Sequence, residues 1–212
     1  MKNLFTIFVS PESTFKRLKS SKLAWLIGMI VLIVLSLLVI YLQMPLLEQT
    51  MLDVLKGNAQ IPPDSYDSLM SANKIGMFLS GPITSIIMIF IIGLLLLLLN
   101  LVVRGEGKYM QFVTIAAFAA LPGMVGDILT GILLNVADAK ALTDVTISLG
   151  TLIQDKGSLL YKALSLINPF SIWTLVLYII GSSVMMNRPK KKVGVWIVIF
   201  WFIFSFGASL LS

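Results

Sequence analysis

The long apolar stretches of this chain constrain its fold more strongly than any motif. From Leu23 to Met44 and again from Met77 to Val103 the sequence is almost wholly hydrophobic. A helix of about 20 such residues crosses the roughly 30 Å hydrocarbon core of a bilayer. Hydrophobic residues form 58% of the chain and charged residues 12%, whereas soluble domains are about half apolar and about a quarter charged. We therefore predict an all-α polytopic membrane protein.

The hydrophobicity pattern predicts a single membrane domain, residues 1–212, with five transmembrane helices. The predicted spans are residues 23–44, 77–103, 112–136, 170–186 and 193–211. Interfacial helices are expected near residues 11–20 and 158–167, where apolar residues recur at helical spacing. Pro45 is expected to help end the first span, which leaves residues 45–76 and 137–169 as two long loops. Residues 61–66 predict a turn inside the first loop, and short helices can flank that turn.

The segment before the first span, residues 1–22, is amphipathic. Pro11 suits the first position of a helix. Phe15 and Leu18 then fall on one face, opposite Lys16 and Lys19. Two interpretations remain open, an interfacial helix on an anionic leaflet or an anchor that only determines topology.

Lysine and arginine residues are distributed unequally among the connections. Eleven of the 16 lie in the amino-terminal segment, in the short connection after the second span and in the turn after the fourth. The two long loops hold the other five, together with seven of the ten acidic residues. Because basic residues favour the cytoplasmic side, we predict a cell-membrane protein with a cytoplasmic amino terminus, extracytoplasmic long loops and an extracytoplasmic carboxyl terminus.

Some of these basic residues are candidates for contact with anionic lipid, each worth about 1 kcal/mol near a charged surface. A basic turn that only sets topology explains the same residues equally well. The candidates are Lys16, Arg17, Lys19, Arg188, Lys190, Lys191 and Lys192.

The third predicted span is the most irregular, and we expect the other spans to pack about it. It contains Pro122, which should kink the helix or unwind a turn. It is also rich in small residues, which allow close helix packing in lipid. They serve either packing inside the bundle or a homo-oligomer contact, and they include Ala116, Ala120, Gly123, Gly126 and Gly131.

Asp127 is the one acidic residue well inside an apolar run. An ionised carboxylate in hydrocarbon costs several kcal/mol, about 2.5–3.5 on insertion scales, so Asp127 should face the bundle interior or a cavity. One interpretation is an ion or proton site, with Asn100 and Asn135 as candidate polar neighbours. The other is a structural carboxylate, in the outer half of the span, that binds local backbone, a hydroxyl or water.

The composition excludes several kinds of chemistry. With no cysteine and no histidine, the chain has no thiolate nucleophile, no imidazole base and few ligands for zinc. Gly105-Glu106-Gly107 lacks the Gly-Lys-Ser/Thr ending of a phosphate-binding loop and a preceding strand. We therefore expect neither enzymatic activity nor a cofactor, metal site or nucleic-acid partner.

Three segments together resemble one family, the Yip-one (Ypt-interacting protein) domain proteins, and in particular its bacterial branch. Residues 11–18, PESTFKRL, resemble the family's Pro-x-x-x-Phe-x-x-Leu opening. Residues 105–112, followed by Ala119-Ala120-Leu121-Pro122, resemble its Gly-rich hairpin and small-residue-Leu-Pro sequence. Residues 166–173, LINPFSIW, resemble its Asn-Pro-Phe-x-x-Trp entry to the fourth span. The resemblance covers essentially the whole chain.

The resemblance implies a five-helix bundle with a cytoplasmic amino terminus. Eukaryotic members act in vesicle trafficking with small GTPases, but the Asp-Leu-Tyr-Gly-Pro motif of those members does not occur here. Some bacterial members accompany ABC-type exporters. We therefore expect a scaffold or accessory subunit of a membrane assembly, whose partners are the bilayer and an exporter-like protein or a second copy. A small transporter or channel that uses Asp127 is the alternative.

Overall fold

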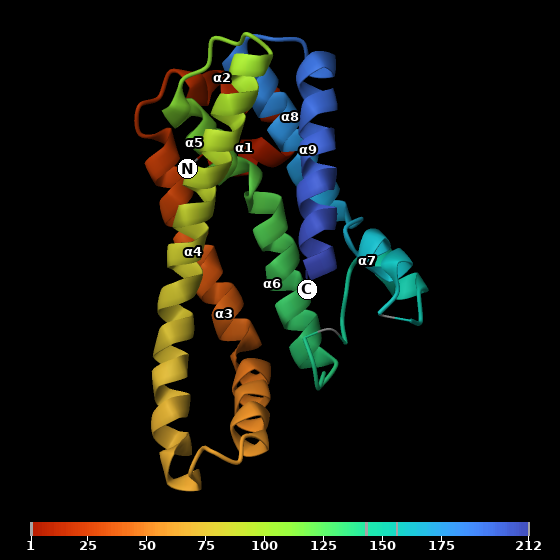
Figure 1. Cartoon of the computed structure of the whole chain (residues 1–212). Helices are drawn as coiled ribbons and strands as arrows, with labels where there is room; N and C mark the ends of the chain where they lie inside the picture. The colour runs from red at the N-terminus through yellow and green to blue at the C-terminus, as the bar shows by residue number, and fades with distance from the viewer. Residues whose placement is uncertain (1, 143, 156, 212) are drawn as a thin grey trace.

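The computed structural model describes residues 2–142, 144–155 and 157–211, with side chains as far as residue 207. Parts of the predicted terminal segments and of the 137–169 loop (residues 1, 143, 156 and 212) lie outside this description. The described part is helical, without a strand, which confirms the all-α prediction (Figure 1). Its elements are α1 (Lys2–Val9), α2 (Pro11–Lys19), α3 (Ala24–Gly57), η1 (Pro63–Ser65), α4 (Tyr66–Val102), α5 (Tyr109–Ala119), α6 (Leu121–Val136), η2 (Leu149–Leu152), α7 (Leu159–Ser165), α8 (Pro169–Met186) and α9 (Lys190–Leu211).

Within the described residues, four helical segments are long and apolar enough to cross a membrane. They are Ala24–Gly57, Pro63–Val102, Tyr109–Val136 and Pro169–Met186, and they correspond to the first four predicted spans. The fifth, α9, is helical over Lys190–Leu211 but begins with three lysines. A total of five spans therefore remains a prediction.

The first two spans are much longer than the sequence predicted. α3 has 34 residues and α4 has 37, which at about 1.5 Å per residue gives roughly 50 and 55 Å. The predicted end at Pro45 is wrong, and so is the idea that residues 45–76 are mainly loop, because only the turn around η1 interrupts the two helices. α4 likewise runs through Pro82 without interruption.

Pairing between α3 and α4 explains why the helices continue through these prolines. A proline removes one helical hydrogen bond at a cost of about 3 kcal/mol, but the turns on either side pack against the other helix (Figure 1). Leu55, near the far end of α3, is only 2% exposed. Lys74 Nζ of α4 also lies 2.6 Å from Glu48 Oε1 of α3.

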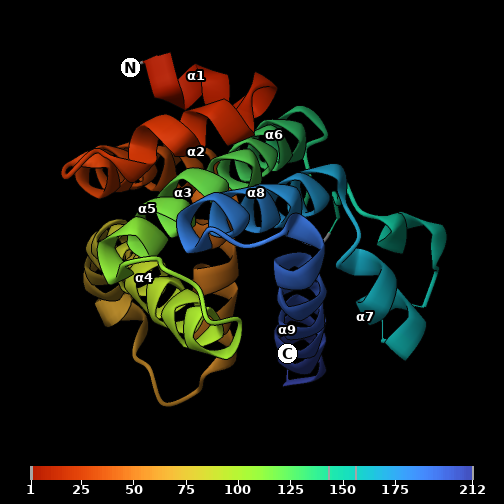
Figure 2. The ribbon, with the colours of Figure 1, turned by 90° about the horizontal axis from the view of Figure 1, so that it is seen from above.

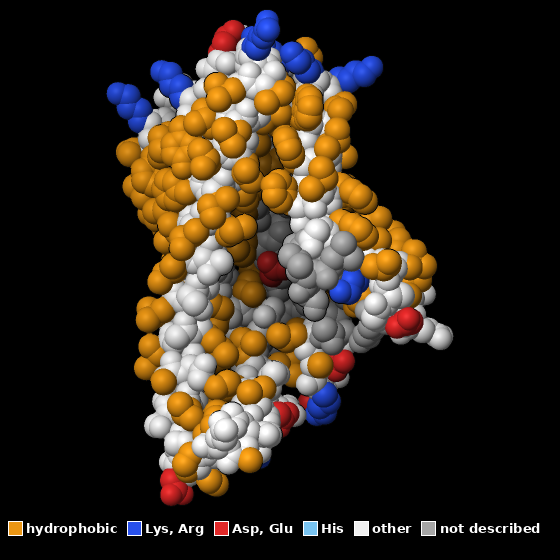
Figure 3. All heavy atoms as spheres, in the orientation of Figure 1, with side chains coloured by type: hydrophobic (Ala, Val, Ile, Leu, Met, Phe, Trp, Pro, Cys, Tyr) orange, Lys and Arg blue, Asp and Glu red, His pale blue; other side chains and the backbone are white. Residues whose placement is uncertain are grey.

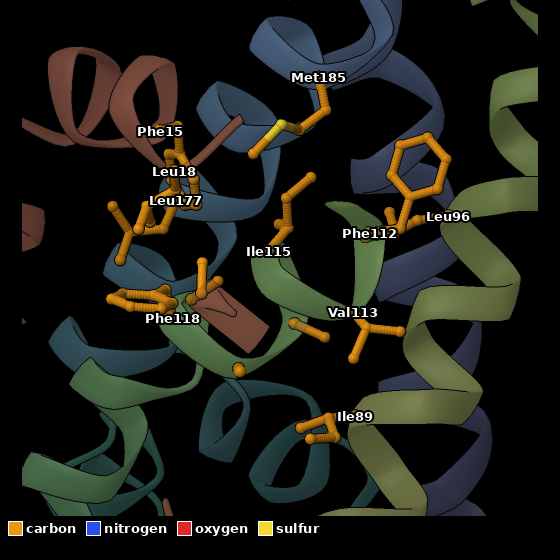
Figure 4. Packing of buried hydrophobic residues seen from close by; sticks show 14 of the residues in the cluster. Phe15, Leu18, Ile89, Leu96, Phe112, Val113, Ile115, Phe118, Leu177 and Met185 are labelled. Carbon is orange, nitrogen blue, oxygen red and sulfur yellow. The ribbon is translucent and has the colours of Figure 1, made fainter. Parts of the chain in front are cut away.

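α5 occupies the middle of the bundle. All eight residues from 112 to 119 are buried, and α5 contacts α2, α3, α4 and α8 (Figures 2 and 4). Glycines on the surrounding helices allow this approach: a Cβ at Gly28 would lie 2.8 Å from Ala117 Cβ, and one at Gly93 would lie 2.8 Å from Val113 Cγ2. The first half of the third span is thus the element on which the others pack.

The third span is broken in the middle. α5 ends at Ala119 and α6 begins at Leu121, with Ala120 between them. Pro122 stands in the first turn of α6, where its missing N–H cannot continue the ladder from α5. The expected interruption is therefore present, and it lets α6 leave the axis of α5 (Figure 1).

The amino-terminal segment differs from the expected surface helix. The predicted helix near 11–20 is present as α2, but α1 precedes it, held by hydrogen bonds from Arg17 to Asn3 and Thr6. Phe15 and Leu18 are 0% and 3% exposed because α2 packs on α8 and α5, so protein and not lipid covers this apolar face (Figure 4).

Two glycines of α4 test the close packing around α5. We expect Gly93→Ala to destabilise the protein by about 1–3 kcal/mol, because its methyl group would collide with the side chain and backbone of Val113. Gly76→Ala has nothing within 4 Å of the new methyl group and should be neutral or stabilising by up to about 1 kcal/mol. Unfolding temperatures of the detergent-purified variants measure the difference, and equal stability of the two variants would contradict this account of the core.

Candidate functional site

A cavity of about 360 Å³ lies between α6, α8 and α9, next to the loop that leads to η2. Asp127 lines it, and Figure 3 shows an acidic side chain in a hollow of the face on view. Its walls also include Trp201 of α9, Phe170 and Thr174 of α8, and Val145 and Ile147 of the loop. This is the one described cavity to which the intramembrane carboxylate belongs, so we treat it as the candidate site.

Two glycines of α6 give the cavity its shape. A Cβ at Gly126 would lie only 2.7 Å from the Phe170 ring, so α6 and α8 touch at this level. One turn earlier, a Cβ at Gly123 would still lie 3.7 Å from Thr174 Oγ1, its one neighbour within 4 Å. Close contact at one glycine and space at the other leave a hollow beside Asp127, which both glycines line.

Some of the polar groups lining the cavity are already satisfied. Asn168 is the N-cap of α8: its Oδ1 accepts a hydrogen bond from the Ser171 N–H at 2.8 Å, while Ser171 Oγ donates to carbonyl oxygens of Leu166 and Asn168. Ser148 Oγ accepts from the Gly150 N–H at 3.2 Å. These bonds hold the loop and the start of α8 in place as one wall.

Other polar groups in the cavity have no protein partner among the described residues. Ser165 Oγ and Thr174 Oγ1 are buried without a hydrogen bond. The Asp127 carboxylate forms neither a hydrogen bond nor an ion pair with any described group, and no lysine or arginine lines the cavity. The two buried hydroxyls cost free energy unless something else satisfies them, whereas Asp127 lines the cavity as an exposed residue.

The two asparagines proposed as neighbours of Asp127 lie elsewhere. Asn100 is at the other end of the bundle, where its Oδ1 accepts from the Gly107 N–H at 3.2 Å and shapes the hairpin after α4. Asn135 is eight residues beyond Asp127 on α6, and its Nδ2 donates to the Leu42 carbonyl of α3 at 2.6 Å. Neither lines the cavity, so the idea of a shared polar site is corrected.

The residues that share the cavity with Asp127 include some from segments remote in sequence. Ser165, Thr174 and Trp201 belong to α7, α8 and α9. In sequence each is an ordinary hydroxyl or aromatic residue of an apolar segment, and no spacing connects it with residue 127. The Asn-Pro-Phe sequence was the only local signal, because it includes Phe170 and the cap that positions α8.

The basic residues gather at the opposite end of the bundle (Figure 3). Arg188 Nε donates to the Val103 carbonyl at 3.2 Å and Nη2 to the Arg104 carbonyl, while Lys192 Nζ donates to the Val103 carbonyl at 3.3 Å. These cations satisfy backbone oxygens at the end of α4, where helical carbonyls lack partners. They thereby join the hairpin after α4 to the turn after α8.

The amino-terminal segment completes this basic end. Lys19 Nζ donates to the Val184 carbonyl at 2.7 Å. Glu12 pairs with Lys16 at 2.8 Å and with Lys190 of α9 at 2.5 Å. Hydrogen bonds and charge from Lys16 and Lys190 lower the pKa of the Glu12 carboxyl to about 2. Glu12, Lys16, Lys19 and Arg188 line a surface hollow of about 500 Å³.

The candidate lipid-contact residues thus divide into two groups. Among the described residues, Lys16, Lys19, Arg188, Lys190 and Lys192 bind acceptors of the chain itself, and Arg17 binds the hydroxyl of Thr6 and the amide of Asn3. Lys191 is exposed without such a bond. Contact with anionic lipid remains a prediction for all seven.

The Glu12 ion pairs predict a pH-dependent stability. Since the pKa of Glu12 falls from 4.5 to about 2 on folding, its stabilising contribution is present above about pH 4.5 and is lost as the pH falls toward 2. Wild type should therefore unfold at a higher temperature than Glu12→Gln at pH 6, and the difference should vanish near pH 2. Asp64→Asn, which removes an exposed carboxylate, is the control, and a difference at pH 2 as large as that at pH 6 would refute the assignment.

Comparison with known proteins gives one match. The sequence model of the Yip1 domain matches residues 5–211. No curated protein and no solved structure is similar to the chain. The match includes α2, the hairpin after α4, the broken third span and the start of α8, which are the segments that define the basic end and the cavity.

Proposed function

This chain belongs to the Yip1 domain family, and from that membership we propose that it is a non-enzymatic scaffold or accessory subunit of a membrane assembly such as an ABC-type exporter. Its helices place it in a lipid bilayer as a multi-pass protein. The proposed protein partner is a membrane protein, with a second copy of this chain as the other candidate.

The observation that carries this proposal is the dense packing of the bundle at its basic end. Phe112, Phe118 and Met185 are each 1% exposed or less. Phe15 and Ile115 meet Gly181 so closely that a Cβ there would lie 2.9 Å and 3.0 Å from them. A core filled in this way by large apolar side chains suits a protein that supports others.

The proposed orientation is a cytoplasmic basic end in the cell membrane. The amino-terminal segment, the hairpin after α4 and the turn after α8 meet at this end and carry most of the basic residues. By the positive-inside rule, this end faces the cytoplasm. The α3–α4 turn, the loop to α7 and the carboxyl terminus then lie outside, with α9 as the fifth span.

A small transporter is the second candidate, and the cavity beside Asp127 favours it. A carboxylate within a transmembrane segment, together with unpartnered hydroxyls, is typical of sites for ions or solutes. Against transport, the cavity lies toward one end of the bundle, and residues 112–119 separate it from the basic end.

Co-purification tests the scaffold proposal. The tagged chain, extracted in a mild detergent, should retain a membrane protein at a fixed stoichiometry, identified by mass spectrometry of the intact complex. A tagged, unrelated multi-pass protein expressed at the same level is the control. A monomer without any retained protein partner would argue against the scaffold and for the transporter.

Asp127→Asn distinguishes the transporter. If the second candidate is correct, this isosteric change should abolish proton- or cation-linked flux into proteoliposomes, whereas Asp138→Asn in the following exposed loop should not. If the chain is a scaffold, wild type and both variants should show the same background flux and retain the same partner. The scaffold proposal would be ruled out if Asp127→Asn abolished the flux and the wild-type protein retained no protein partner.

A further inference from the structure

We propose that the cavity beside Asp127 binds a primary ammonium group, R–NH3⁺. Four described polar groups that line it have no protein partner, the Asp127 carboxylate and the hydroxyls of Thr130, Ser165 and Thr174, and we assign to the ligand the carboxylate and the two buried hydroxyls, those of Ser165 and Thr174. The proposal rests on neither function above, because a scaffold and a transporter could each hold such a ligand.

Charge is the first argument. Asp127 brings one negative charge to a cavity that no lysine or arginine of the described residues lines. A carboxylate within a transmembrane segment is stabilised by a cation, and leaving it unpaired costs free energy. A cationic ligand supplies the missing charge, whereas an anion would be repelled.

Hydrogen-bonding capacity is the second argument, because it selects among cations. An ammonium group has three N–H donors and no acceptor. The cavity offers a matching set: a carboxylate that only accepts and two hydroxyls, Ser165 Oγ and Thr174 Oγ1, that can each accept. Of its other hydroxyl and amide groups, those of Thr146, Ser148, Asn168 and Ser171 are already engaged in the loop and the α8 cap, which leaves only Thr130 among the described lining residues.

Size and apolar lining are the third argument. The cavity volume of about 360 Å³ lies near the lower end of the range for ligand pockets, about 300–1,000 Å³. It far exceeds the volume of a bare metal ion. Among the described residues no three acidic side chains gather to bind a metal. Trp201 and Phe170 line the cavity, and aromatic faces favour organic cations, while Val145 and Ile147 offer apolar surface to the attached carbons.

The position of the cavity defines the sources of such a group. Phe170, Ser171 and Thr174 belong to the first turns of α8, at the end away from the basic turn. Trp173 in the same turns is 37% exposed, as expected for an aromatic residue at a membrane interface. At this depth an ammonium group can come from an aminophospholipid headgroup or from a soluble amine.

Two arms of one experiment separate these sources. In the first, ethanolamine is titrated into the full-length protein in a detergent free of aminolipids, and binding is measured by calorimetry, with sodium chloride as the ionic-strength control. In the second, the protein is released from nanodiscs containing phosphatidylethanolamine and phosphatidylglycerol, and native mass spectrometry counts retained lipids. One saturable ethanolamine site indicates the soluble amine, and one retained phosphatidylethanolamine without ethanolamine binding indicates the headgroup.

Variants show whether the binding uses this cavity. Asp127→Asn should weaken binding by about tenfold or more, since it removes a charge-assisted hydrogen bond. Ser165→Ala and Thr174→Val should weaken it by about threefold each. Without ligand, the Ser165→Ala and Thr174→Val variants should be no less stable than wild type, because the hydroxyls that they remove have no hydrogen-bond partner. Asp138→Asn, the same change at an exposed carboxylate, should bind as wild type does.

Two results would overturn the proposal. One is the absence of both ethanolamine and phosphatidylethanolamine binding by wild type. The other is undiminished binding by Thr174→Val and Ser165→Ala, which keeps the test decisive even if Asp127→Asn fails to fold. The first result includes retention of phosphatidylglycerol in place of phosphatidylethanolamine.

Discussion

The close approach of helices around α5 is the contact on which the rest of this structure depends. Lipid tails are as apolar as the helix surfaces, so the hydrophobic effect contributes little to helix association inside a bilayer. Close van der Waals packing between helix backbones drives the association instead. Gly28, Gly93 and Gly181 provide it on three neighbouring helices, each facing a residue of the buried stretch 112–119. α2 then closes the cluster by placing Phe15 against Gly181, which makes the amino-terminal segment part of the core.

The break at Ala120 divides the bundle into two unlike halves. Toward the basic end, α5 is surrounded and the interior is filled by large apolar side chains (Figure 4). Beyond the break, α6 touches α8 at Gly126 but stands away from it at Gly123, and a polar cavity opens beside Asp127. The interruption that ends the dense core is thus followed by a cavity that a carboxylate and unpartnered hydroxyls of the described residues line together.

The basic end shows how charge and packing act together. Arg188, Lys19 and Lys192 donate to backbone carbonyls near the ends of α4 and α8, while Glu12 bridges α2 and α9. The lysine and arginine residues that favour a cytoplasmic location for this end thus also connect the three segments that meet there. Their charge supports the proposed orientation, and their hydrogen bonds hold the dense half of the bundle together.

The sequence by itself determined the helical class, the first four membrane segments, the helix at α2 and the interruption of the third span, because hydrophobicity, proline and helical spacing act locally. It failed at Pro45, at α1 and at the burial of Phe15, where contacts with distant helices outweigh local preference. Asp127 stood out as a lone carboxylate, but the sequence offered Asn100 and Asn135 as neighbours, and the fold uses both elsewhere. Only the tertiary structure decided that Ser165, Thr174 and Trp201 share its cavity, because their meeting depends on how three separate helices pack.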